Sequence, residues 1–127
     1  LLTTVNKDIV MPESVVSFEL KNNDFIEIQK AASVLQLPDL CLRSNGDSME
    51  LVALDKKDTT SNNYSVSLGD LPHGDHDFEF YFKVENLKLL PGDYNVEVTE
   101  KVVSKFSHQD FDLFYWIALE SDSYYEV

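Results

Sequence analysis

Residues 78–98 read FEFYFKVENLKLLPGDYNVEV, which is two strand-like runs on either side of a short segment with a different pattern. The first run is strongly aromatic, and the second alternates apolar and polar side chains, as strands do. Between them, Val84–Leu90 predicts one or two turns of helix, and Pro91-Gly92-Asp93 would end it. Two basic residues, Lys83 and Lys88, lie on or beside this short helix.

Basic residues are scarce in this chain, which limits the functions it can have. Its 127 residues include 10 Lys and Arg against 23 Asp and Glu, a formal net charge of −13. A charge of this sign and size repels polyanions. It excludes a nucleic-acid-binding protein that uses its whole surface, so such a role would require the few cations to gather on one face.

Length and cysteine content set further limits. The chain is long enough for one domain with a substantial core. It has no apolar run of membrane-spanning length, no visible signal peptide and no initiator methionine, so it could be a fragment of something longer. The single Cys41 excludes a disulfide framework and favours a reducing, intracellular setting. We predict that Cys41 is a small, buried apolar side chain.

Upstream of this segment, Asp24–Leu37 predicts a longer helix. Asp24 and Glu27 resemble a capping box, with Asn23 as an alternative cap, and Pro38 would end the helix. The apolar side chains that recur at helical spacing are Phe25, Ile28, Ala31, Ala32 and Leu35. Lys30 falls near the middle of the opposite, outer face.

The remaining segments predict strands and turns. Asn45-Gly46-Asp47 is a strong hairpin signal between two apolar runs. The predicted strands are 15–20, 40–43, 49–54, 64–68, 78–82, 94–99, 102–107 and 111–119. Most connections are too short for crossovers, so we expect an α+β fold with mainly antiparallel pairing and both helices on one face of the sheets. The aromatic cluster Phe111, Phe114, Tyr115 and Trp116 is expected in the core, although part of it could line a partner pocket.

Three stretches, with their order and spacing, resemble a known family. They are YSVSLGD (64–70), FEFYFKVENLKLLPGDY (78–94) and YWIALESDS (115–123). The chain resembles the second half of the sliding clamps, or DNA polymerase processivity factors, of T-even-type bacteriophages. The resemblance implies an interdomain connector at residues 1–14 and a C-terminal clamp domain at 15–127, without the N-terminal domain.

The resemblance also implies a function. Such clamps are rings of three subunits around duplex DNA, with sheets outside and two helices per domain lining the hole. The implied partners are DNA, the DNA polymerase and the clamp loader, in the cytoplasm of the infected bacterial host. No enzymatic activity, cofactor, metal or membrane is implied. An acidic structural or protein-interaction module without a DNA role remains the alternative.

The resemblance places candidate DNA-facing residues at Lys30, Lys83 and Lys88. Lys30 matches a basic position of the first clamp helix, and Lys88 matches a lysine of the second. Ser33 stands where a second basic residue is expected, which predicts a weaker positive lining. The alternative for each lysine is an ordinary solvated charge. Lys56 and Lys57 are expected to be loop residues that aid solubility.

Two apolar segments are candidates for binding a partner peptide. They are the lead-in, with Ile9 and Met11, and the tail, with Tyr124 and Tyr125. The tail tyrosines follow the last predicted strand and have no evident core role, so we expect them to be available for a partner. The alternative is that Ile9 and Met11 pack onto the domain and that the tail is frayed.

A metal site is the remaining hypothesis. His73 and His76, with the neighbouring aspartates, have side chains that could bind a divalent ion in a metal-dependent hydrolase. The loop contains Pro72 and Gly74, and no third dispersed ligand is evident, so we expect a solvated loop and no metal.

Overall fold

The computed structural model describes the chain except for residues 1–13, 59, 61, 71–76, 100–102 and 127. Within the described residues there are nine strands, one α-helix and one 3₁₀ turn. In order they are β1 Ser14–Leu20, α1 Asn22–Val34, β2 Asp39–Asn45, β3 Ser48–Leu54, β4 Tyr64–Asp70, β5 Asp77–Lys83, η1 Val84–Asn86, β6 Tyr94–Thr99, β7 Val103–His108, β8 Phe114–Ala118 and β9 Tyr124–Glu126.

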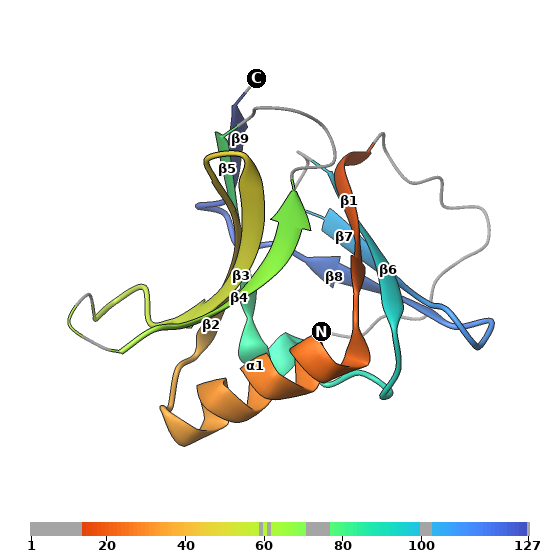
Figure 1. Cartoon of the computed structure of the whole chain (residues 1–127), viewed down its shortest axis with the longest axis horizontal. Helices are drawn as coiled ribbons and strands as arrows, with labels where there is room; N and C mark the ends of the chain where they lie inside the picture. The colour runs from red at the N-terminus through yellow and green to blue at the C-terminus, as the bar shows by residue number, and fades with distance from the viewer. Residues whose placement is uncertain (1–13, 59, 61, 71–76, 100–102, 127) are drawn as a thin grey trace.

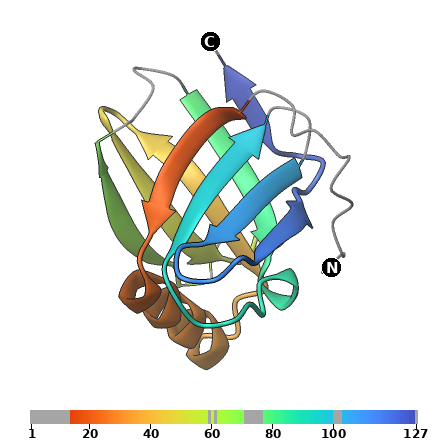
Figure 2. The same cartoon turned by 90° about the vertical axis from the view of Figure 1, so that its right-hand side faces the viewer.

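The strands form two antiparallel sheets that face each other across the core. One sheet has the order β1-β6-β7-β8 and the other β4-β3-β2-β5-β9. The two views show α1 and η1 at the same end of the sheets (Figures 1 and 2). The predicted α+β class with antiparallel pairing is confirmed.

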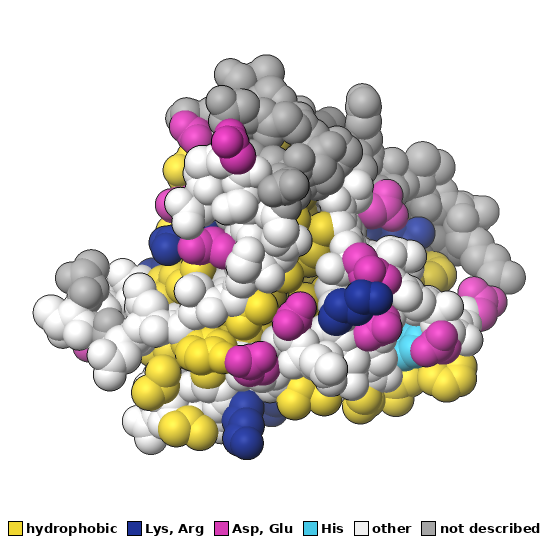
Figure 3. Space-filling view, viewed as in Figure 1, with side chains coloured by type: hydrophobic (Ala, Val, Ile, Leu, Met, Phe, Trp, Pro, Cys, Tyr) yellow, Lys and Arg dark blue, Asp and Glu magenta, His cyan; other side chains and the backbone are white. Residues whose placement is uncertain are grey.

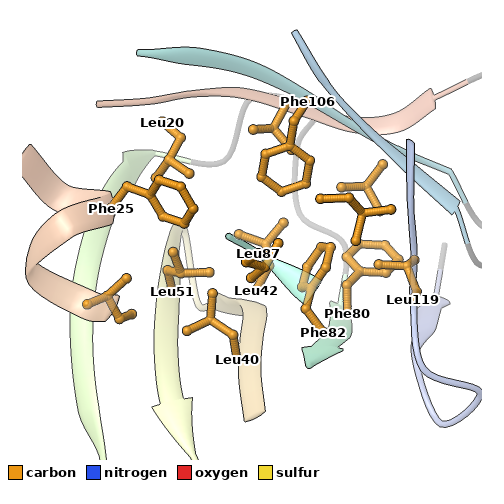
Figure 4. Packing of buried hydrophobic residues seen from close by; sticks show 14 of the residues in the cluster. Leu20, Phe25, Leu40, Leu42, Leu51, Phe80, Phe82, Leu87, Phe106 and Leu119 are labelled. Atoms are coloured by element: carbon orange, nitrogen blue, oxygen red, sulfur yellow. The ribbon is translucent and has the colours of Figure 1, made fainter. Parts of the chain in front are cut away.

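Side chains that alternate along the strands fill the space between the sheets. On β5, Phe78, Phe80 and Phe82 are buried while the side chains between them face outward. Figure 4 shows the rings of Phe80 and Phe82 in one cluster with leucines of their own sheet and with Leu20 of the opposite sheet, while Phe25 enters from α1 and Phe106 from β7. The aromatic run that opens the quoted segment is therefore one wall of the core.

The hairpin and the cysteine agree with prediction. β2 and β3 pair from Asp39↔Leu54 to Asn45↔Ser48, which leaves a two-residue turn. Gly46 has φ +64 there, a conformation that favours glycine. Cys41 is 1% exposed, and burial raises the pKa of its thiol to about 12.

The helix α1 is confirmed, but its predicted cap is wrong. It begins at Asn22, two residues before the predicted start, and ends at Val34. Asp24 and Glu27 lie inside the helix and do not form a capping box. Instead, the Asn22 N–H donates to Asp93 Oδ1 at 2.7 Å, and Asn22 Oδ1 accepts from the Gly92 N–H at 3.0 Å. The cap thus comes from a loop 71 residues away in sequence.

The second predicted helix is also wrong, because 84–90 forms a single 3₁₀ turn, η1, over Val84–Asn86. The helix does not continue past η1, because the Leu89 N–H donates to the Leu87 carbonyl instead of to a helical partner. The Leu87 side chain is buried, 1% exposed. The Leu87 carbonyl also accepts from Gln29 Nε2 of α1 at 2.7 Å. Packing of Leu87 therefore outweighs the local helical tendency, and among the described residues one α-helix lies at this end of the sheets instead of the predicted two.

The C-terminal segments differ from prediction as well. Tyr125 belongs to an unpredicted strand, β9, and stacks on Phe78 and Phe80, so the expectation that it has no core role is wrong. Of the aromatic cluster predicted for the core, only Tyr115 packs against it. Phe111 is 60% exposed, and Phe114 and Trp116 are half-buried beside the Lys105 ammonium.

Candidate nucleic-acid interface

A groove lies between the C-terminal end of α1 and η1. Its volume is about 570 Å³. The lining comes from three places in the sequence: the last turns of α1 with the loop to β2, the end of β5, and η1 together with Lys88. The lining residues are Gln29, Ala32, Ser33, Gln36, Leu37, Pro38, Asp39, Lys83, Val84, Glu85 and Lys88.

The structure brings two of the three predicted DNA-facing lysines into this groove. Lys83 and Lys88 line it, and both are exposed. Lys30 is exposed on α1, one turn before the lining residue Ser33, and therefore lies beside the groove. Basic side chains project from the end of the molecule that α1 occupies (Figure 3).

Carboxylates moderate the charge of the groove. Glu85 and Asp39 line it together with the two lysines, so the lining is not strongly positive. Burial raises the pKa of Asp39, against the lowering effect of a hydrogen bond from the Lys56 N–H. Lys83 Nζ also lies 3.7 Å from Glu120 Oε1. Lys30 and Lys88 are consequently the cations in the predicted set with no ion pair among the described contacts.

Lys56 has a role that the sequence did not predict. Its ammonium lies 2.8 Å from Glu120 Oε2 and 3.0 Å from both carboxylate oxygens of Asp122. Burial lowers the pKa of Lys56, but these two carboxylates outweigh burial and raise it, so the side chain stays charged. The polar run around Lys56 resembles any solvated loop, and no local signal distinguishes this lysine from Lys57.

The predicted partner-binding residues are only partly described. Ile9 and Met11 lie outside the described residues. Tyr124 is 43% exposed on β9, whereas Tyr125 is half-buried against the core. The structure thus separates the two tail tyrosines, because neighbouring residues of a strand face opposite sides of the sheet.

The metal hypothesis falls on residues that the structure does not describe, since His73 and His76 are both in the range 71–76. Elsewhere, in the described part of the chain, no group of three His, Cys, Asp or Glu side chains is arranged to hold a metal ion. The described helices are also too short or too polar to cross a membrane.

Comparison with known proteins identifies relatives. A family model described as the C-terminal domain of the gp45 sliding clamp matches residues 17–121. The chain is 31% identical over 106 residues to the sliding clamp of Vibrio phage KVP40, covering 82% of this chain and 47% of that protein. It is 28% identical over 124 residues to the sliding clamp of Escherichia phage RB69, covering 93% and 53%. The chain thus spans about half the length of these curated relatives.

Solved structures agree with this assignment at the level of the fold. The β clamp of Helicobacter pylori bound to a DNA ligase peptide matches with a TM-score of 0.67 and 16% identity, covering 94% of this chain and 34% of that one. The same clamp in complex with diflunisal matches with a TM-score of 0.65. The matched family model covers most of the chain, and the sheets and α1 have the clamp arrangement. The chain therefore belongs to the family of gp45 sliding clamp C-terminal domains.

Proposed function

We propose that this chain is the C-terminal clamp domain of a DNA polymerase processivity factor, which tethers the replicative polymerase to duplex DNA. The observation that carries the proposal is the family match over residues 17–121. The role is non-enzymatic and belongs in the cytoplasm of an infected bacterium. Residues 1–14 would be the connector to the other clamp domain.

The charge distribution suits a protein that must hold DNA and still slide along it. Contacts from a few lysines to phosphates are exchangeable and do not read base sequence. Lys30 and Lys88 are exposed and would supply such contacts, with a smaller contribution from Lys83 because Glu120 is close to it. The acidic remainder of the surface would keep DNA from binding elsewhere.

The test compares two sets of lysines in the whole protein to which these residues belong. Substituting Lys30, Lys83 and Lys88 together by alanine should make the negative slope of log K for duplex DNA against log salt shallower by about 2 to 3 per subunit and shorten polymerase products. Lys21→Ala with Lys57→Ala removes two exposed lysines away from the groove and should change neither. Equal effects of both sets would contradict a DNA-facing groove and favour an acidic interaction module.

The ring assembly is a further part of the proposal. Three subunits would contact one another head to tail, an arrangement in which two different surfaces meet. The 127 residues alone should therefore be a monomer or weak dimer, whereas the whole protein should be a trimer around DNA that needs a clamp loader to close. Light scattering at micromolar concentration measures both, and a stable trimer of the 127-residue chain would count against this scheme.

The partner surface is proposed to include Ile9, Met11, Tyr124 and Tyr125. Tyr125 would contribute mainly by anchoring β9 on the core, which holds Tyr124 in place. The related β clamp was solved with a DNA ligase peptide, which supports binding of a short peptide by this fold. Tyr124→Ala should weaken binding of a polymerase C-terminal peptide with little change in melting temperature, because the side chain is 43% exposed. Unchanged affinity in a titration would remove Tyr124 from the site.

A further inference from the structure

The segment between β8 and β9 connects the two sheets. β8 lies in the four-stranded sheet and β9 in the five-stranded sheet, so residues 119–123 must cross from one to the other. The crossing runs along the outer edge of β5. The Glu120 N–H donates to the Tyr81 carbonyl at 2.8 Å, and the Tyr81 N–H donates to Ser123 Oγ at 2.8 Å.

The strand that this crossing leads to is short. β9 has three residues and pairs with β5 at Asp77, Phe78 and Glu79. So few ladder positions hold a strand weakly, because a short strand can open locally at little cost in free energy. Contacts in the crossing add to the stacking of Tyr125 on Phe78 and Phe80 and help to keep β9 in register.

Lys56 supplies those contacts from a different part of the chain. It follows β3, and its ammonium reaches Glu120 at 2.8 Å, Asp122 at 3.0 Å and the face of the Tyr81 ring, 4.9 Å from its centroid. The Lys56 and Glu120 side chains are only 21% and 18% exposed. Pairing at this depth is screened less by salt than a surface pair is. The Lys56 N–H also donates to Asp39 Oδ2, which anchors the lysine backbone on β2.

We infer that Lys56 is a positioning residue, whose ammonium holds the 119–123 crossing against β5 and thereby fixes β9 and the orientation of Tyr124. The consequence for partner binding rests on the function proposed above, whereas the positioning of the strand does not. Lys83 contributes less, because its ammonium is 3.7 Å from Glu120 and half exposed.

The adjacent lysine provides a matched control. Lys57 is exposed, and its described contact is made by the backbone, whose N–H donates to Asp55 Oδ1 at 3.0 Å. Lys56→Met and Lys57→Met therefore change charge and length identically and differ in the contacts with Glu120 and Asp122. Asp122→Asn is a second route to the same contacts, at a side chain that is 54% exposed and tolerates change.

Hydrogen exchange of the purified whole protein, followed by mass spectrometry, tests the inference without a partner. Lys56→Met should speed exchange of the amides of residues 120–126 about tenfold, since charged hydrogen bonds are lost, while Leu42 and Leu51 in the core keep their protection. Asp122→Asn should give a smaller increase in the same peptides. Lys56→Arg should largely restore protection, and Lys57→Met should resemble wild type.

Two results would overturn the inference. One is exchange in residues 120–126 that is the same for Lys56→Met and Lys57→Met. The other is acceleration spread evenly over core and tail in Lys56→Met together with wild-type exchange in Asp122→Asn, which would make Lys56 a general stability residue. If the exchange results hold but Lys56→Met binds a polymerase C-terminal peptide as tightly as wild type, the partner role of β9 fails and the positioning stands.

Discussion

Two segments at the same end of the molecule, residues 24–37 and residues 84–90, were both predicted to be helical, but only the first forms an α-helix, α1. α1 buries Phe25, Ile28 and Ala32 on one stripe over thirteen residues, so its periodicity is enough to define a helix. Residues 84–93 form one 3₁₀ turn, after which the buried Leu87 side chain and the positive φ of Gly92 set the path of the backbone. A short segment with one buried anchor takes the conformation that its neighbours permit.

The two segments are nevertheless coupled. Asp93 caps the first turn of α1, and Gln29 of α1 bonds to the Leu87 carbonyl. We therefore expect substitutions at the residues that anchor 84–93, namely Gly92, Leu87 and Asp93, to lower the free energy of unfolding more than matched substitutions elsewhere.

The largest effect is expected at Gly92. Its φ is +146, and an added Cβ would lie 2.1 Å from His108 Nε2. His108 cannot move freely, because Nε2 bonds the Pro91 carbonyl at 3.0 Å and Nδ1 accepts the Asp110 N–H. Gly92→Ala should lower the free energy of unfolding by about 4 kcal/mol from strain and overpacking together.

The control for Gly92 is Gly46, which also has positive φ but open space around it. Gly46→Ala should cost only about 1 kcal/mol, from backbone strain alone. Urea denaturation of both variants measures the difference. Equal losses would show that His108 does not constrain the 91–93 loop.

Leu87 should have the next largest effect. It is 1% exposed and joins the main core, so Leu87→Ala should cost about 3 kcal/mol through lost burial and a cavity. Leu90, three residues later, is 43% exposed, and Leu90→Ala should cost less than about 1 kcal/mol. Thermal denaturation would contradict the anchoring role of Leu87 if the two variants melted together.

The cap gives a smaller effect and separates sequence expectation from structure. Asp93→Ala should cost about 1 to 2 kcal/mol, because the Asn22 N–H at the start of α1 loses its acceptor and a favourable charge. Asp24→Ala removes the cap expected from sequence. It should lower the free energy of unfolding by only about 0.3 kcal/mol, through a lost interaction with the helix dipole. A reversed order in chemical denaturation would restore Asp24 as the cap.

The smallest effect should differ in sign between the two segments. Val34 ends α1 and is 73% exposed, so Val34→Ala should stabilise by about 0.5 kcal/mol through helix propensity. Val84 begins η1 and packs against the core, so Val84→Ala should destabilise by about 1 kcal/mol. Precise melting curves of the pair resolve the sign; stabilisation by both would mean that 84–90 responds to helix propensity after all.

Much of the fold was predictable because its signals are local. The Asn45-Gly46-Asp47 turn, the alternation along β5 and the stripe of α1 each lie within one short window. Lys83 and Lys88 were DNA-facing candidates through the family resemblance, and the structure places both in the lining of one groove. The groove that they line was not predictable, because α1 and the β2 loop complete it from residues about 50 positions earlier in the sequence.

By itself the sequence determined the α+β class, the antiparallel pairing, the burial of Cys41 and the membership of the clamp family. Tertiary structure decided the cap of α1 by Asp93, the reduction of 84–90 to one turn, the burial of Tyr125 and the pairing of Lys56 with Glu120 and Asp122. Periodicity and turn chemistry depend on neighbours in the chain, and so they can be read along it. Caps, anchors and partly buried ion pairs depend on which distant residues the packed core brings within about 3 Å, the distance of a hydrogen bond.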